Sequence, residues 1–201
     1  MIRVLIAEDQ AMMRGALTVL LNLEADIEVV GEVADGDRIV PEARAAGPDV
    51  ALLDIELPGT NGIDACRGLR GELPSCRVIM VTTFGRPGYL RRALDAGAAG
   101  FLVKDGPVDG LADAIRAVVN GQTVIDPELA AGAIRAGDNP LTDRECEVLS
   151  AAANGSPVSD IAEALHLSQS TVRNYLSSAI SKTGTRNRIE AVHVVREQGW
   201  L

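Results

Sequence analysis

Aromatic residues are scarce in this chain of 201 residues, which has two Phe, two Tyr and one Trp. Because 47% of the residues are nevertheless hydrophobic, the cores must be built from Ala, Val, Leu and Ile. No apolar stretch approaches the roughly 18 residues that a membrane-spanning helix needs, and the N-terminus lacks the profile of a signal peptide. These absences predict a cytoplasmic protein that does not insert into membranes.

Cysteine and histidine are too few and too scattered for a zinc site or a disulfide framework. Cys66, Cys76 and Cys146 are widely spaced and form no CxxC pair, which predicts reduced, packed thiols. His166 and His193 lack metal-ligand spacing, and we expect His166 to be a turn or surface residue.

Basic residues are outnumbered, and the net charge of −9 argues against a nucleic-acid-binding protein that is basic throughout. A bulk average does not exclude a local basic patch. The length allows one large domain or two small ones, at roughly 100–200 residues per domain.

Short β-rich apolar runs alternate with segments of helical period through the first 120 residues. The apolar runs cover residues 2–7, 27–33, 49–53, 77–82 and 100–103. The helical segments lie near residues 11–23, 37–46, 61–71, 87–97 and 107–120. Five such units predict a doubly wound α/β fold, a parallel five-stranded sheet covered by helices on both faces.

Acidic residues directly follow two of the predicted strands. The first run ends at Glu8-Asp9 and the third at Asp54, with Glu56 two residues later. In a flavodoxin-like strand order 2-1-3-4-5, the first and third strands are neighbours where the order reverses, so Glu8, Asp9 and Asp54 would share one cleft. Their mutual repulsion favours a hard divalent cation with oxygen ligands, of which Mg²⁺ is the usual one.

Thr82 and Lys104, which end the fourth run and follow the fifth, bring a hydroxyl and an ammonium group to the same edge of the sheet. Singly, each residue has an ordinary explanation: a strand-end acid is often a cap or loop charge, Thr82 strand filler and Lys104 a solvated group. Together they suit a phosphoryl group, with a carboxylate as the nucleophile that forms an acyl phosphate.

The strand signal ends before the last third of the chain. Residues 121–139 contain three Gly and a Pro, and we interpret them as a linker with a short helix. Residues 140–201 predict an all-helical domain of four short helices. Thr142 caps the first with Glu145 in a capping box, Ser168 caps the third, and Thr185 or Asn187 opens the fourth. The tight turn at residues 166–167 between two helices suggests a helix-turn-helix.

Charge within this helical domain is unevenly distributed. No acid occurs between Ser168 and Arg188, although the domain as a whole is mildly acidic. Basic and hydroxyl side chains concentrated there fit a DNA phosphate backbone. A solvated helix face without function is the alternative.

Residues 1–120 resemble the receiver domain of two-component response regulators in the stretches VLIAEDQ, ALLDIELPGTNG, VIMVTTF and AGAAGFLVKD. The resemblance implies that Asp54 accepts a phosphoryl group from a sensor histidine kinase. It also implies Mg²⁺ binding by Asp54, by Asp9 directly, by Glu8 through water and by the backbone carbonyl of Glu56.

The same resemblance assigns a switching role to three residues near the fifth strand. Thr82 and Lys104 match the pair that senses the phosphoryl group. Phe101 matches the aromatic switch residue, whereas the sequence pattern alone would place it in the core.

Residues 140–201 resemble the LuxR-type helix-turn-helix of the NarL/FixJ regulators in LTDRECEVL, DIAEALHLSQSTVRNYL and KTGTRNRIEAV. The resemblance implies that the third helix enters the DNA major groove and that the fourth mediates dimerisation. Ala191, Val192, Val194 and Val195 suit a dimer face, or they close the domain core. The residues expected at the DNA are Ser168, Thr171, Arg173, Asn174, Ser177, Lys182 and Arg188, with Arg173, Asn174 and Ser177 nearest the bases.

The chain is also similar to regulators of a fatty-acid desaturase response to membrane fluidity. That similarity implies a membrane-bound kinase and, in the active state, a homodimer on double-stranded DNA. The dimer face is either the first and fifth helices, which this similarity favours, or the fourth helix, fifth strand and fifth helix.

Two alternatives to a response regulator remain. One is a Mg²⁺-dependent phosphohydrolase in which Asp54 is the nucleophile and Glu56 the general acid/base, although no cap or substrate domain accompanies them. The other is a DNA-binding protein whose receiver is idle. We favour a regulator that is not an enzyme beyond promoting its own phosphorylation and dephosphorylation.

Overall fold

The computed structural model describes residues 1–83, 87–104, 109–136 and 139–200. The first two residues of the predicted helix 107–120 lie outside these ranges. The chain divides into two compact units, one holding nearly all of residues 1–131 and the other holding residues 132–201. Each unit is described by itself.

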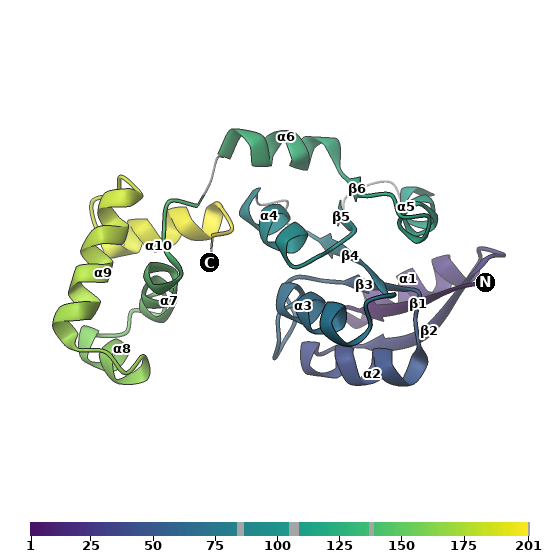
Figure 1. Ribbon diagram of the computed structural model, residues 1–201, viewed down its shortest axis with the longest axis horizontal. Helices are drawn as coiled ribbons and strands as arrows, with labels where there is room; N and C mark the ends of the chain where they lie inside the picture. The colour runs from purple at the N-terminus through teal and green to yellow at the C-terminus, as the bar shows by residue number, and fades with distance from the viewer. Residues whose placement is uncertain (84–86, 105–108, 137–138, 201) are drawn as a thin grey trace. The chain divides into compact units, whose positions relative to one another are not determined.

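The first unit is a parallel sheet wound on both faces by helices (Figure 1). Its strand order is β2-β1-β3-β4-β5-β6, which confirms the predicted order 2-1-3-4-5 and adds a sixth strand. The strands are β1 (Ile2–Ala7), β2 (Ile27–Val33), β3 (Val50–Leu53), β4 (Arg77–Thr82), β5 (Gly100–Val103) and β6 (Val124–Ile125).

The sixth strand lies inside the segment interpreted as a linker. Val124 and Ile125 pair with Gly100 and Phe101, and Val124 packs against the apolar core of the sheet. The pairing covers the edge of β5, which would otherwise present unpaired backbone groups. Two residues are too short for the alternation that identifies a strand in a sequence. The helix expected in this segment is α6 (Pro127–Ala136).

The helices of the first unit follow the predicted rhythm. They are α1 (Ala11–Asn22), α2 (Ile39–Ala46) after a short 3₁₀ turn at Gly36–Arg38, α3 (Gly62–Glu72), α4 (Pro87–Asp95) and α5 (Asp109–Val119). One apolar cluster joins alternate strand residues to α1 and α5. It includes Val4, Ile6, Val50, Leu52, Ile79, Val81, Leu21, Leu111, Ile115 and Val118.

The central strand β3 is buried along its whole length, so the apolar run before Asp54 is explained by helices on both faces of the sheet. Two of the predicted packed thiols lie in the same unit. Desolvation raises the pKa of Cys66 to about 11 and that of Cys76 to about 12, so neither thiol is a reactive nucleophile at neutral pH.

The second unit consists of α7 (Asp143–Ala152), α8 (Val158–Ala164), α9 (Gln169–Lys182) and α10 (Arg188–Glu197). Its core is aliphatic and includes Val148, Leu149, Ile161, Val172, Leu176, Ala191 and Val195, with Trp200 packed against it. Within the described part of the chain, no helix combines the length and apolar character that crossing a membrane requires.

The predicted helix caps of this unit are confirmed. Thr142 and Glu145 form a reciprocal capping box at α7, and Ser168 accepts a hydrogen bond from the backbone N–H of Thr171 at α9. Asn187 rather than Thr185 caps α10. His166 lies exposed in the turn between α8 and α9, as expected.

Candidate functional site

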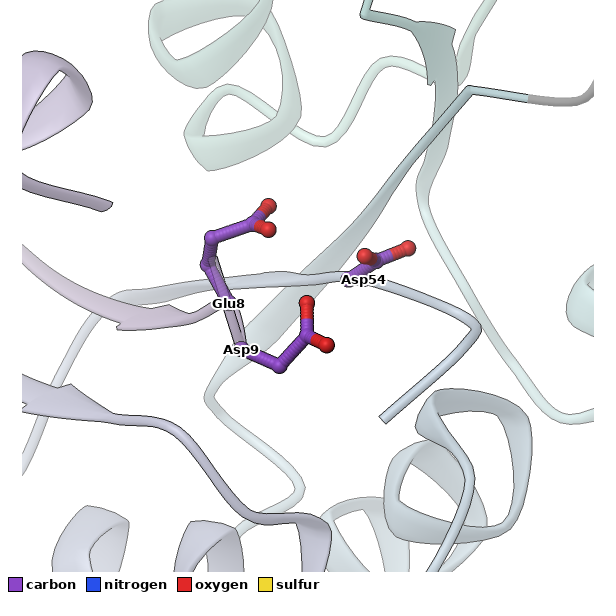
Figure 2. Close-up of side chains that lie close together, drawn as sticks. All are labelled: Glu8, Asp9 and Asp54. Atoms are coloured by element: carbon purple, nitrogen blue, oxygen red, sulfur yellow. The ribbon is translucent and has the colours of Figure 1, made fainter. Parts of the chain in front are cut away.

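Three carboxylates meet at the carboxyl edge of the sheet, at the predicted reversal of strand order. Glu8 and Asp9 follow β1, and Asp54 follows the neighbouring strand β3. One oxygen from each carboxylate lies within 4.8 Å of the other two, and Figure 2 shows the three side chains turned toward a common space. Glu8 and Asp54 are buried, whereas Asp9 is exposed and leaves the cluster open to solvent.

Lys104 compensates two of these carboxylates directly. Its ammonium Nζ lies 2.6 Å from Glu8 Oε2 and 2.8 Å from Asp54 Oδ2, and its side chain is only 4% exposed. Desolvation lowers the pKa of Lys104. The hydrogen bonds to Asp54 and Glu8 raise the pKa by more than desolvation lowers it, so the pKa lies above its usual value. Lys104 is therefore a buried, charged counterion rather than a solvated surface group.

The loop after β3 folds back onto Asp54. The backbone N–H of Glu56 donates to Asp54 Oδ1 at 3.3 Å, while the Glu56 side chain is exposed. A Cβ on Gly62 would lie 2.0 Å from the carbonyl oxygen of Asp54, so only glycine allows α3 to begin so close to the site. The metal-binding role of the Glu56 carbonyl stays a prediction.

Thr82 and Phe101 lie on the two strands beyond β3. Thr82 ends β4 and is buried, and its carbonyl accepts a hydrogen bond from the backbone N–H of Lys104 at 2.8 Å. Phe101 is fully buried, as the core interpretation expected. Their assignment to phosphoryl sensing and switching stays a prediction.

Arg14 is a contributor that the sequence reasoning missed. Its Nη1 donates to the carbonyl oxygen of Glu8 at 2.6 Å, and its Nε lies 3.6 Å from Glu32 Oε2. Arg14 thus holds the β1–α1 loop that carries Glu8 and Asp9. In the sequence it is one charge on a helix, with no signal that it reaches back to that loop.

The carboxylate cluster fits a magnesium ion. Glu8, Asp9 and Asp54 supply hard oxygen donors of the kind Mg²⁺ binds, and the exposed Asp9 gives access from solvent. Because Lys104 already neutralises Glu8 and Asp54, a metal ion at this site competes with a bound ammonium group for the same carboxylates.

A second candidate surface is the outer face of α9. Arg173, Asn174 and Ser177 are exposed, while Val172 and Leu176 on the opposite side are buried in the domain core. The predicted base-facing residues therefore share one solvent-facing side of the helix. That arrangement leaves their side chains available to a ligand.

Two of the cations expected at the DNA make contacts within the domain. Lys182 Nζ lies 2.8 Å from Oε2 of the buried Glu145, and Arg188 donates to the carbonyl oxygen of Ser156 at 3.0 Å. Ser178 Oγ donates to the other oxygen of Glu145 at 2.6 Å. Glu145 thus fastens α9 to α7, a role that the sequence did not reveal. The DNA contacts of Lys182 and Arg188 stay predictions.

The apolar residues of α10 mostly close the core. Ala191, Val192 and Val195 are buried, and Val194 is half-buried. Of the two alternatives for this face, burial in the domain core holds for these three residues. Ile189 is the large apolar residue that α10 leaves exposed.

Comparison with known proteins agrees with the division of the chain into two units. Residues 4–116 match the response regulator receiver domain, and residues 139–195 match the bacterial regulatory proteins of the luxR family. The chain is 46% identical to the transcriptional regulatory protein DesR of Bacillus subtilis over 201 residues, covering 100% of both chains. It is 37% identical to the response regulator RamR of Streptomyces coelicolor, covering 100% of this chain and 98% of RamR.

Solved structures give the same result. The response regulator ChrA of a heme-sensing two-component system is 33% identical with a TM-score of 0.59, covering 100% of this chain and 98% of ChrA. The response regulator RcsB in complex with DNA is 27% identical with a TM-score of 0.68, covering 98% of each chain. A receiver domain and a LuxR-type domain in one chain, with full-length relatives of the same organisation, place this protein in the family of LuxR-type two-component response regulators.

Proposed function

We propose that this response regulator is phosphorylated on Asp54 by a sensor histidine kinase in the presence of Mg²⁺, and that phosphorylation drives dimerisation and sequence-specific DNA binding. The observation that carries the proposal is the buried Asp54 carboxylate, held 2.8 Å from Lys104 beside Glu8 and Asp9. This arrangement supports Asp54 as the nucleophile that accepts a phosphoryl group, and the luxR-family domain in the same chain favours a regulator over an enzyme that turns over an external substrate.

In the proposed reaction, a carboxylate oxygen of Asp54 attacks the phosphorus of a phosphohistidine. The P–N bond breaks, an acyl phosphate forms, and the kinase imidazole is the leaving group. Lys104 would neutralise phosphoryl oxygens, and Thr82 would donate a hydrogen bond to them. Bound Mg²⁺, held by Glu8, Asp9, Asp54 and the Glu56 carbonyl, would supply electrostatic stabilisation of the transferring group.

We propose that the active dimer forms through α1 and α5. Met12 is 89% exposed, Val19 63% and Leu23 77%, all on or at the end of α1. A cavity of about 300 Å³ lies beside α1, and its lining comes from α1, from the ends of β4 and β5, from the start of α5, and from Lys104 and Asp126. Among the described residues, the alternative face around α4 and β5 exposes less apolar surface, chiefly Leu94 at 37%. Burying the α1 side chains in a dimer would therefore remove more apolar surface from water than burying the α4–β5 face.

The DNA-binding half of the proposal rests on the exposed face of α9 and on the similarity to RcsB, which is known in complex with DNA. A dimer would place two α9 helices on half-sites one helical turn apart. The similarity to DesR supports a membrane-bound kinase and a target gene in membrane-lipid or desaturase metabolism. Such a regulator would act in the cytoplasm, where the DNA lies.

The test compares molecular mass and DNA binding with and without a small phosphodonor plus Mg²⁺. We expect the wild type to become dimeric and to bind DNA more tightly, and Asp54→Asn to respond in neither assay. Asp95→Asn, which changes an exposed carboxylate on α4, is the matched control and should respond like the wild type.

Other outcomes would support the alternatives. Steady release of phosphate from an ester, in place of stoichiometric labelling of Asp54, would indicate a phosphohydrolase. Dimerisation and full DNA binding by Asp54→Asn without phosphodonor would indicate an idle receiver.

The dimer face is tested by placing a charge on each candidate surface. Val19→Glu should keep phosphorylation but abolish dimerisation, because a carboxylate would be buried in an apolar interface. Leu94→Glu should leave the phosphorylated dimer intact. The reverse result, loss of the dimer only in Leu94→Glu, would assign dimerisation to the α4–β5–α5 face.

A further inference from the structure

Arg173 is an exposed arginine whose side-chain partner carries no charge. Its Nη2 donates to Gln169 Oε1 at 3.2 Å, so its partner is a neutral amide. Four other exposed arginines of the described structure pair with carboxylates that compensate their charge. Such pairs are Arg44–Glu72, Arg67–Asp64, Arg144–Glu147 and Arg186–Glu190.

Gln169 and Arg173 are one helical turn apart on the exposed face of α9. Gln169 is the first residue of the helix, and both side chains are exposed. A spacing of four residues places side chains next to each other on a helix. The amide oxygen takes one N–H of the guanidinium and leaves the others for a ligand, without cancelling the positive charge.

We propose that Gln169 is a positioning residue that holds the Arg173 guanidinium in the orientation that reads a base edge. The inference rests on the proposed DNA-binding function of α9. Arg recognises guanine with two parallel hydrogen bonds, so its affinity for the correct base depends on the orientation of the guanidinium plane. An arginine held before binding loses less conformational freedom on the DNA than a free one.

The neutral partner is essential to this role. A glutamate at position 169 would form the kind of ion pair seen between Arg186 and Glu190, where Arg186 Nη2 lies 2.7 Å from Glu190 Oε1. It would orient Arg173 equally well but would neutralise it and add a negative charge facing the phosphates. Glutamine therefore orients Arg173 without compensating its charge. Gln169→Ala tests the orientation, and Gln169→Glu tests the need for an uncompensated charge.

The experiment uses the full-length protein with phosphodonor and Mg²⁺. Duplexes are first selected from a random-sequence library on the wild type, and binding is then measured to the selected duplex and to its single-base-pair variants over a range of salt concentrations. The variants are Gln169→Ala, Gln169→Glu, Arg173→Ala and the double variant of Gln169→Ala with Arg173→Ala. Gln122→Ala, the same chemical change at an exposed residue of the first unit, is the control.

We expect Arg173→Ala to lose discrimination at one base pair by about 10- to 100-fold. Gln169→Ala should lose about 3- to 10-fold at that same base pair, with an unchanged slope of affinity against salt concentration. Gln169→Glu should weaken binding to all duplexes and lower that slope by about one charge. The double variant should discriminate no worse than Arg173→Ala alone, because Gln169 acts only through Arg173.

Three results would overturn the inference: Gln169→Ala discriminating like the wild type, altering discrimination at a different base pair, or adding its loss to that of Arg173→Ala. The second would mean that Gln169 reads a base itself. If the wild type selected no preferred sequence, the proposed DNA-binding function would fail, which is a separate outcome. Circular dichroism and Trp200 fluorescence verify that each variant is folded.

Discussion

At the scale of single residues, His166 carries an unusual backbone conformation. Its φ of 54° makes it the one non-glycine residue with positive φ among those the structure describes. The left-handed region costs an L-residue roughly 1–2 kcal/mol, although histidine is among the residues that tolerate it best. His166 therefore closes the turn between α8 and α9 under mild strain.

Replacing His166 by glycine should stabilise the second unit by about 0.5–1 kcal/mol, because relief of strain outweighs the added freedom of the unfolded chain. Urea unfolding followed by fluorescence of Trp200, the only tryptophan, measures this unit directly. Gly155→Ala is the converse control: its φ is 80°, so alanine should destabilise by about 1 kcal/mol. A less stable His166→Gly variant would show that the imidazole contributes contacts of its own.

Lys104 allows a second prediction at this scale. Lys104→Gln should destabilise the first unit by about 3 kcal/mol, because Glu8 and Asp54 lose their buried counterion. The same change should tighten Mg²⁺ binding about tenfold, since the ammonium no longer competes for these carboxylates. Saturating Mg²⁺ should therefore reduce the difference in free energy of unfolding between Lys104→Gln and the wild type.

Thermal unfolding of the first unit with and without Mg²⁺, together with calorimetric titration, measures both effects of Lys104→Gln. The chain has one other lysine, and Lys182→Gln in the second unit should leave Mg²⁺ affinity unchanged. Weaker Mg²⁺ binding by Lys104→Gln would mean that Lys104 organises the metal site rather than competing for it.

At the scale of elements, Glu145 fastens α9 to α7. Desolvation raises the pKa of Glu145, but hydrogen bonds from Lys182, Ser178 and Thr142 outweigh it and lower the pKa to about 2. A carboxyl group with a lowered folded-state pKa stabilises the fold fully above its unfolded pKa of about 4.5, and that contribution is lost as the pH falls toward 2.

Glu145→Gln should therefore destabilise the second unit by about 2 kcal/mol at pH 7, because an amide replaces an acceptor of charged and backbone donors. The difference from the wild type should stay constant above pH 5 and shrink between pH 5 and pH 2. Urea unfolding monitored at Trp200 over this range measures it. Glu163→Gln, at an exposed residue of α8, should show no such pH-dependent difference. If the stability difference between Glu145→Gln and the wild type stayed unchanged at pH 2, the contribution of Glu145 would not come from its ionised carboxylate.

Gly36 allows the loop after β2 to pass close to the loop after β3. A Cβ at Gly36 would lie 1.6 Å from the carbonyl oxygen of Thr60, and the Gly36 N–H donates to the carbonyl of Pro58 at 2.9 Å. Gly36→Ala should destabilise the first unit by about 2–3 kcal/mol, since backbone must move. Gly15→Ala, where an added Cβ meets nothing within 4 Å in the middle of α1, should stabilise by up to about 1 kcal/mol. Thermal unfolding followed by circular dichroism compares the two variants. Equal stabilities of Gly36→Ala and Gly15→Ala would show that the loops move apart at no energetic cost.

The elements that could be predicted from the sequence are those with a periodic pattern or a local cap. The five longer strands, the order of strands and the caps at Thr142 and Ser168 all follow from such signals. The convergence of Glu8, Asp9 and Asp54 follows from the rule that ligands bind at a reversal of strand order.

The elements that escaped prediction depend on contacts between distant residues or on very short segments. Lys182 and Glu145 are 37 residues apart, so the sequence around either residue does not indicate that they pair. β6 has two residues, too few for a period. Gln169 was overlooked because composition suggested charge and hydroxyl groups, whereas its contact with Arg173 depends on the side-chain geometry of α9.

At the scale of the whole molecule, the two units have separate hydrophobic cores. We expect calorimetry to resolve two unfolding transitions, and phosphodonor plus Mg²⁺ to raise only the transition of the first unit, because ligands stabilise the unit that binds them. Fluorescence of Trp200 identifies the transition of the second unit. Asp54→Asn should remove the shift. A parallel rise of both transitions would mean that phosphorylation stabilises the two units together.

The short strand β6 has a practical consequence for anyone who isolates the receiver. A fragment that stops at residue 120, where the predicted domain ends, would remove Val124 and Ile125 and uncover the backbone of Gly100 and Phe101. Such a bare edge invites pairing between copies, so this fragment should self-associate without any phosphodonor. A fragment that continues to residue 131 keeps the edge covered. Oligomer sizes measured on the shorter piece would therefore reflect where the chain was cut rather than how the regulator is switched.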